Sequence, residues 1–207
     1  TGEQHSKAGA LFKEFILGGQ DGLVNVLGVI LGIAVATNNA KIVIIAGLAA
    51  AFAESFSMAA VAYTSGKAQE DYYYSQQGKE KYEIDNIPKR ERKEVKDIYY
   101  KKGFRGKLLN DIVKHVVSNK KIWLETMMYE ELGLSKEFIS PLKAALVVGI
   151  AAIVGSFIPL TAFFFLSIKQ AIIYSIIISA IALFITGTIE AKMNVGKWWK
   201  KGLELTI

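Results

Sequence analysis

The chain has 207 residues, of which 52% are hydrophobic, and it carries a formal net charge of +6. It contains no cysteine, which excludes disulfide frameworks, thiolate metal sites and cysteine nucleophiles. Its two histidines, His5 and His115, have no ExxH or HxxxH partner, so neither a histidine zinc site nor a ferritin-like oxidase is expected. Apolar residues form blocks almost free of charge, whereas charges crowd into one central stretch. This segregation is typical of a membrane protein.

Four segments are long and apolar enough to cross a bilayer of about 30 Å, which requires about 20 helical residues. They cover residues 22–40, 42–66, 144–168 and 170–189. The alternative is a set of buried core helices, but a soluble protein of this size rarely needs four helices that are apolar on all sides. The sequence therefore predicts an all-α, polytopic transmembrane protein. We expect breaks at Asn38-Asn39 and at Ser167-Ile168-Lys169.

The distribution of lysine and arginine predicts which side of the membrane each segment faces. Seventeen of the 25 lie in residues 67–143, and 23 of the 25 fall on one side of the predicted spans. We expect this side to be the cytoplasm. The predicted organisation is residues 1–66 with spans one and two, a helical cytoplasmic insert at 67–143, and residues 144–207 with spans three and four.

The insert reads as a series of short helices. Pro88 suits a first helical position, with Asp85 or Asn86 as the cap, and that helix should run to about Tyr100. A second helix is predicted over 106–117, and a third over 120–132 with Asn119 as its cap. An apolar stripe on the second helix consists of Leu108, Leu109, Ile112, Val113 and Val116.

The insert also contains four carboxylates at helical spacing: Glu80, Glu83, Glu91 and Glu94. On one straight helix they would share a face, but the first and last would be about 21 Å apart along the axis. One compact metal site would therefore need a bend at residues 86–88, and two separate sites are the alternative. A solvated charged face is the simplest reading of glutamates among lysines.

A second group in the insert combines sulfur with carboxylates. Met127 and Met128 lie beside Glu130 and Glu131, and on an α-helix Met127 and Glu131 would share a face. A thioether next to a carboxylate suits a borderline metal such as ferrous iron better than calcium or magnesium. The competing reading is methionine as packing filler.

Polar residues inside the predicted spans are few. Asp21 lies at the start of the first span, Glu54 lies within the second, and Met58 follows Glu54 by one turn. Ionisable groups in a span are costly and usually functional, so these three could line one pathway, although Asp21 also suits a helix cap. Small residues four apart, at Gly28, Gly32 and Ala36, permit close helix packing or dimerisation.

Several separated motifs, in order, resemble the vacuolar iron transporter family. They are Asp21-Gly-Leu-Val-Asn-Val-Leu-Gly-Val in the first span, Ser57-Met58-Ala59 and Tyr63-Thr-Ser65 in the second, the paired glutamates of the insert, and Met127-Met128-Tyr-Glu-Glu131. The resemblance runs from about Gly18 to Lys201. It implies five spanning helices and a homodimer that exports Fe²⁺ from the cytosol by proton antiport, with Mn²⁺ and other divalent metals as further candidates.

Carried over to this chain, the resemblance implies a transport pathway and a metal site. The pathway is Asp21 and Met58, to which we add Glu54, and the metal ligands are Glu80, Glu83, Glu91, Glu94, Met127, Met128 and Glu131. The metal is substrate, and neither a prosthetic group nor enzymatic activity is expected. The location would be the plasma membrane in a prokaryote or the vacuolar membrane in a eukaryote, with insert and amino terminus cytoplasmic.

Two departures from the family pattern stand out. Many members have glutamate just before the tyrosine of the second span, where this chain has Ala62, and Glu54 lies two turns earlier on the same face. We hypothesise that Glu54 replaces it. The segment Gly202–Ile207 resembles only the beginning of a fifth span. A metal-responsive channel or scaffold is the alternative function, whereas nucleic-acid binding is not expected because acids alternate with the lysines and no known motif is present.

Overall fold

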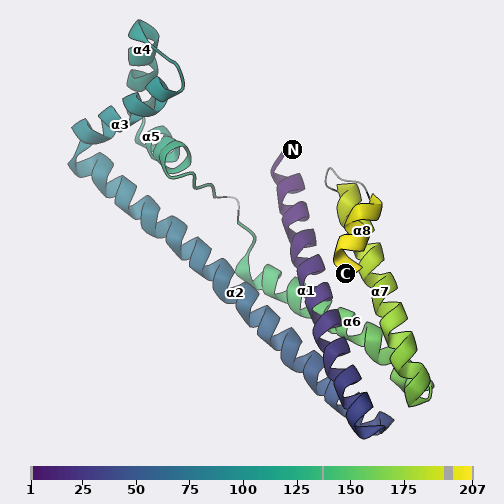
Figure 1. The fold of residues 1–207 in the computed structure, drawn as a ribbon. Coiled ribbons are helices and arrows are strands. Elements are labelled where there is room, and N and C mark those ends of the chain that lie inside the picture. Colours follow the sequence, from purple (N-terminus) through teal and green to yellow (C-terminus); the bar gives the residue numbers. More distant parts are fainter. Residues whose placement is uncertain (1, 137, 194–197, 207) are drawn as a thin grey trace. The chain divides into compact units, whose positions relative to one another are not determined.

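The computed structural model describes residues 2–136, 138–193 and 198–206, and these residues form helices and connecting segments without a strand (Figure 1). The elements are α1 (Gly2–Thr37), α2 (Ala40–Asn86), α3 (Pro88–Lys101), α4 (Gly106–Val117), α5 (Lys120–Thr126), the π-helix η1 (Met127–Glu131), α6 (Pro141–Phe165), α7 (Ile168–Met193) and α8 (Trp198–Thr206). The all-α prediction is confirmed. Two compact units form: the membrane unit, Thr1–Gly66 with Ile139–Ile207, and the insert unit, Lys67–Phe138.

Four of the described helices have the length and composition to cross a membrane: α1, α2, α6 and α7. The predicted spans 42–66 and 170–189 lie within α2 and α7, whereas the predicted spans 22–40 and 144–168 each run three residues past the end of α1 and α6. Residues 202–206 of the segment expected to begin a fifth span belong to α8, a short helix that packs on α7, where Gly202 lies against the ring of Phe184. Ile207 lies outside the described residues. The outer face of α7 carries exposed isoleucines one turn apart, Ile173, Ile177, Ile181 and Ile185. Such a face is suited to contact with lipid.

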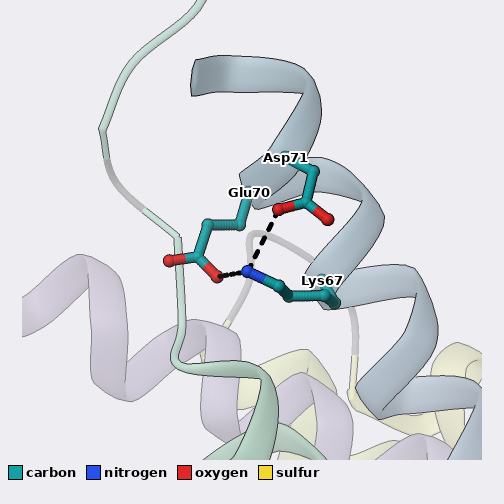
Figure 2. A network of polar contacts seen from close by, with 3 residues as sticks. All are labelled: Lys67, Glu70 and Asp71. Carbon is teal, nitrogen blue, oxygen red and sulfur yellow. Dashed lines mark hydrogen bonds and ion pairs between the residues drawn. The ribbon is translucent and has the colours of Figure 1, made fainter. Parts of the chain in front are cut away.

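Helix α2 differs from the prediction because it does not end near Gly66. It continues to Asn86, a run of 47 residues and about 70 Å of helix. No proline interrupts it, and ion pairs support the stretch just after Gly66. Figure 2 shows the Nζ of Lys67 between Glu70 Oε2, at 3.1 Å, and Asp71 Oδ1, at 3.0 Å. Pairs at these spacings stabilise a helix locally.

The two tight turns between spans lie close to where they were predicted. At the first, Asn38 adopts a left-handed φ of 46°, and the side chain of Asn39 accepts hydrogen bonds from the backbone N–H of Lys41 and Ile42. Asparagine tolerates this φ and caps helices well, so the break at Asn38-Asn39 is confirmed. The second turn falls at Leu166-Ser167, slightly earlier than expected.

In the membrane unit, α1 and α6 approach so closely that their glycines face backbone. A Cβ placed on Gly22 would lie 2.2 Å from the carbonyl oxygen of Ala152, and one on Gly155 would lie 2.0 Å from that of Gly19. Ser156 Oγ adds a hydrogen bond to the Gly22 carbonyl at 3.1 Å. Residues of α1, α2, α6 and α7 then form one apolar core: Val26, Ile30, Ala34, Val43, Ala51, Leu160, Ala162, Phe163 and Ala171.

The small residues predicted to favour close helix packing do not pack against another helix among the described residues. Gly28, Gly32 and Ala36 are all exposed. A Cβ on either glycine would have no neighbour within 4 Å. This face of α1 is therefore available to another molecule.

The insert unit has its own core, drawn from five elements: Ile84, Val95, Leu109, Val113, Val116, Trp123 and Met127. Helix α4 has the predicted bounds, but Leu108 is exposed and does not belong to the buried stripe, because it lies one residue off the Leu109–Val113–Val116 line. Asn119 caps α5 as predicted, accepting hydrogen bonds from Lys121 and Ile122.

The predicted cap of α3 is wrong. Its N-cap is Ile87, which makes no side-chain capping bond. Asp85 instead pairs with Lys120 at 2.5 Å, and the Asn86 side chain donates to the Tyr82 carbonyl at 2.8 Å. Both polar side chains are thus engaged elsewhere, and proline at the first helical position supplies the start without needing a cap.

Candidate metal centre

Three glutamates of the insert unit converge because the chain bends between α2 and α3. Proline disfavours helical geometry at the preceding residue, and Ile87 has φ −129° and ψ 46°. A straight helix would separate Glu80 and Glu91 by about 16 Å. In the bent chain, one carboxylate oxygen from each of Glu80, Glu83 and Glu91 lies within 4.8 Å of the others. This is the bend that a single compact site requires.

Two of these carboxylates are buried, and neither forms an ion pair with a described residue. Glu91 is 0% exposed and Glu80 is 6% exposed. Among the described residues, both carboxylate oxygens of Glu91 lack a hydrogen-bond partner, and so does the Oε2 of Glu80. A buried carboxylate with nothing to bind is expensive, and native proteins keep such groups where a ligand or proton compensates them. The pocket of oxygens is therefore suited to a hard or borderline divalent cation.

The electrostatics extend this group to five carboxylates. Burial, together with the smaller effect of the charges of Glu131, Glu83 and Glu94, raises the pKa of Glu80 to about 7. Burial likewise raises the pKa of Glu91 to about 7, assisted by Glu94, Glu80 and Glu83. The pKa of Glu131 is raised by burial and then by Glu94 and Glu83. A cation between them would remove this mutual repulsion.

Among the described residues, the ion pairs near this group involve Glu94 and the adjacent Glu130, and not the three converging glutamates. Arg90 Nε bonds Glu94 Oε1 at 2.9 Å, so Glu94 is partly neutralised. Arg90 also opposes the rise in the pKa of Glu131. Glu130, next to Glu131, forms an ion pair with Lys102 instead. Arg90 was not among the sequence-predicted residues, although its position four residues before Glu94 could have indicated the pair.

The two methionines lie in a stretch that is not α-helical. At Met127 the chain changes to η1, where the Leu132 N–H bonds the Met127 carbonyl, five residues back, at 3.3 Å. The expectation that Met127 and Glu131 share an α-helical face is therefore wrong in its geometry. Met127 is 0% exposed within the insert core, and Met128 is 2% exposed outside that cluster. Single π-turns inside helices are frequent at functional sites.

Two of the predicted pathway residues of the membrane unit, Asp21 and Glu54, lie near each other. The Glu54 carboxyl on α2 lies near the side chains of Asp21 and Asn25 on α1 and interacts with both electrostatically. Met58 follows Glu54 by one turn and is half-buried. Asn25 was not predicted, but a polar side chain one turn after Asp21 in an apolar helix was a signal for it. Two neighbouring carboxyl groups within a span can hold a proton or a cation between them.

The chain matches the VIT family over residues 12–207. It is 32% identical to "Vacuolar iron transporter 1" of Tulipa gesneriana over 194 residues, which cover 93% of this chain and 78% of that protein. It is 33% identical to "Vacuolar iron transporter 1" of Arabidopsis thaliana over 204 residues, covering 98% and 82%. It is also 33% identical to "Vacuolar iron transporter" of Plasmodium falciparum (isolate 3D7) over 166 residues, covering 78% and 61%. The chain therefore belongs to the VIT family.

Proposed function

We propose that this chain is a membrane transporter that exports Fe²⁺ from the cytosol in exchange for protons. The observation that carries the proposal is the convergence of Glu80, Glu83 and Glu91, with buried oxygens that lack a partner among the described residues. Membership of the VIT family, the names of its relatives and four helices able to cross a membrane support it.

The first step is capture of the ion by the insert unit in the cytosol. Glu80, Glu83 and Glu91 supply carboxylate oxygens, and Glu94 and Glu131 contribute negative charge around them. Carboxylates alone would also accept Mg²⁺ or Ca²⁺. A thioether from Met127 or Met128 would favour Fe²⁺ over these harder ions, with Mn²⁺ and other divalent metals as secondary substrates.

The second step is passage through the membrane unit. Asp21, Glu54 and Met58 form the pathway, with Glu54 carrying the proton or metal role that Ala62 cannot fill. Protons and metal compete for the same carboxylates, which couples their movement in opposite directions. The exposed Gly28, Gly32 and Ala36 face of α1 suits a second copy, and the active form is a homodimer. The insert and amino terminus are cytoplasmic, and the protein resides in the plasma or vacuolar membrane according to the cell type.

Flux in proteoliposomes tests this function. The full chain is reconstituted with an Fe²⁺-quenched dye inside, and Fe²⁺ is added outside with or without an acidic lumen. We expect the acidic lumen to accelerate uptake and the lumen to become more alkaline as Fe²⁺ enters. Glu54→Gln should abolish this dependence, whereas Glu190→Gln, which removes a carboxyl from α7, should preserve it.

Two results would contradict the proposal. Uptake that ignores the pH gradient and moves no protons would make the chain a channel. A vesicle that takes up no divalent metal in either condition would overturn iron transport itself.

A further inference from the structure

A groove on the insert unit, away from the carboxylates, is lined almost entirely by cations. Its volume is about 270 Å³, and its walls are Lys89, Arg92, Lys93 and Lys96 of α3 with Asn110 and Val113 of α4. We name this feature the basic groove. Its lining contains no acidic residue, so a negatively charged ligand would meet no repulsion from the walls.

The basic groove lies on the opposite face of α3 from the metal centre. At 100° per residue, Lys89, Arg92, Lys93 and Lys96 fall within one arc of about 100°. Glu91 and Glu94 are centred about 180° away on the same helix. Helix α3 therefore separates a cluster of carboxylates from a cluster of cations, and ligands on its two faces need not compete.

Within the described part of the chain the cations of the groove form no ion pair, unlike several of their neighbours. In the insert unit, Lys67, Arg90, Lys102, Lys120 and Lys121 each lie within 4.0 Å of a carboxylate oxygen. None of the four groove cations has such a partner among the residues that the structure describes. Holding like charges together on one face costs free energy unless an anion offsets it.

We propose that the basic groove binds a ligand that carries phosphate groups. Arg92 presents a planar fork that matches two phosphate oxygens, and the lysines add point charges around it. Asn110 adds an amide donor from the second wall. A dense, multiply charged anion suits four cations in a space of this size better than a single carboxylate does. The phosphate could belong to a lipid headgroup or to a soluble phosphate compound.

Titration of the full chain in neutral detergent distinguishes these sources. One arm uses inorganic tripolyphosphate, and the other uses a short-chain phosphatidic acid below its micellar concentration, both followed calorimetrically. Lys93→Gln/Lys96→Gln should weaken binding at least about tenfold, since two charge-assisted hydrogen bonds to the phosphate groups are lost. Lys79→Gln/Lys101→Gln removes the same charge from outside the groove and should change affinity less than about twofold.

Binding in either arm with this pattern supports the site, and the arm that binds identifies the source. Divalent metal binding, measured in parallel, should be unchanged in Lys93→Gln/Lys96→Gln and will report an intact insert unit. The proposal is overturned if neither probe binds, if the two double variants lose affinity equally, or if poly-glutamate binds the groove as tightly as tripolyphosphate. The test does not depend on iron transport.

Discussion

At the scale of single residues, Glu91 is the carboxylate of the metal centre whose ionisation is most costly in the absence of a metal ion. It is fully buried, and its oxygens have no hydrogen-bond partner in the described chain. Burial raises its pKa to about 7, from an ordinary value near 4.5. The folded state therefore binds the Glu91 proton more tightly than the unfolded state does. The contribution of Glu91 to the free energy of unfolding is fully present below pH 4.5 and is lost as the pH rises through about 7.

We predict that Glu91→Gln stabilises the metal-free insert unit at pH 8, by on the order of 2 kcal/mol, because the amide cannot ionise. At pH 5 the gain should fall to about a quarter of this value, since the folded-state carboxyl is then protonated while the unfolded-state carboxyl is still largely ionised. Urea unfolding of the full chain can be followed by fluorescence of the buried Trp123, in a Trp198→Phe/Trp199→Phe background.

Asp97→Asn is the matched control, because it removes a carboxylate from an exposed position of the same helix. Its effect should be small and equal at the two pH values. If Glu91→Gln lowers stability equally at pH 5 and pH 8, the side chain has a structural role and the ionisation argument fails.

Residue types and register at the metal centre could be predicted from the sequence, but burial could not. The spacing of Glu80, Glu83, Glu91 and Glu94 indicated a common face, and Pro88 indicated where a bend was possible. Whether the chain would bend enough to bring the oxygens together depends on the packing of Ile84 and Val95 into the insert core, a tertiary effect. The basic groove on the other face of α3 could not be predicted for the same reason, because its second wall is supplied by α4.

At the scale of elements, local signals predicted helix ends well where a strong residue marked them. Asn119 and the Asn38-Asn39 turn are examples. These local signals did not predict a helix end where no strong residue marks one. Helix α2 continues past Gly66 because no proline or other helix-terminating residue follows it there. The α-helix begun at Lys120 widens into η1 at Met127, a change that no residue preference predicts.

The contact of α1 with α6 makes a sharp prediction about glycine. Gly155→Ala would place a Cβ 2.0 Å from the Gly19 carbonyl oxygen, and backbone atoms cannot move aside as a flexible side chain can. We expect a loss of roughly 1–3 kcal/mol, seen as a lower thermal midpoint in detergent. Gly78→Ala is the control, because a Cβ there meets nothing within 4 Å and alanine favours the helix. Equal midpoints for the two variants would contradict the close approach of α1 and α6.

At the scale of the whole molecule, the metal centre should bind its ion less tightly as the pH falls, because protons compete for Glu80 and Glu91. With pKa values of about 7, Glu80 and Glu91 are each about half protonated at neutral pH, so binding one divalent ion should release about one proton. At lower pH more protons are held, and each must leave when the metal ion binds. We predict that the affinity for the metal ion falls at least about tenfold from pH 7.5 to pH 6.

Calorimetry of the full chain in buffers of different ionisation enthalpy measures both the metal affinity and the number of protons released. In Glu80→Gln/Glu91→Gln the residual affinity should hardly change with pH. A wild-type affinity independent of pH would mean that the ion binds outside these carboxylates, and the insert unit could then not respond to acidification as capture and release require.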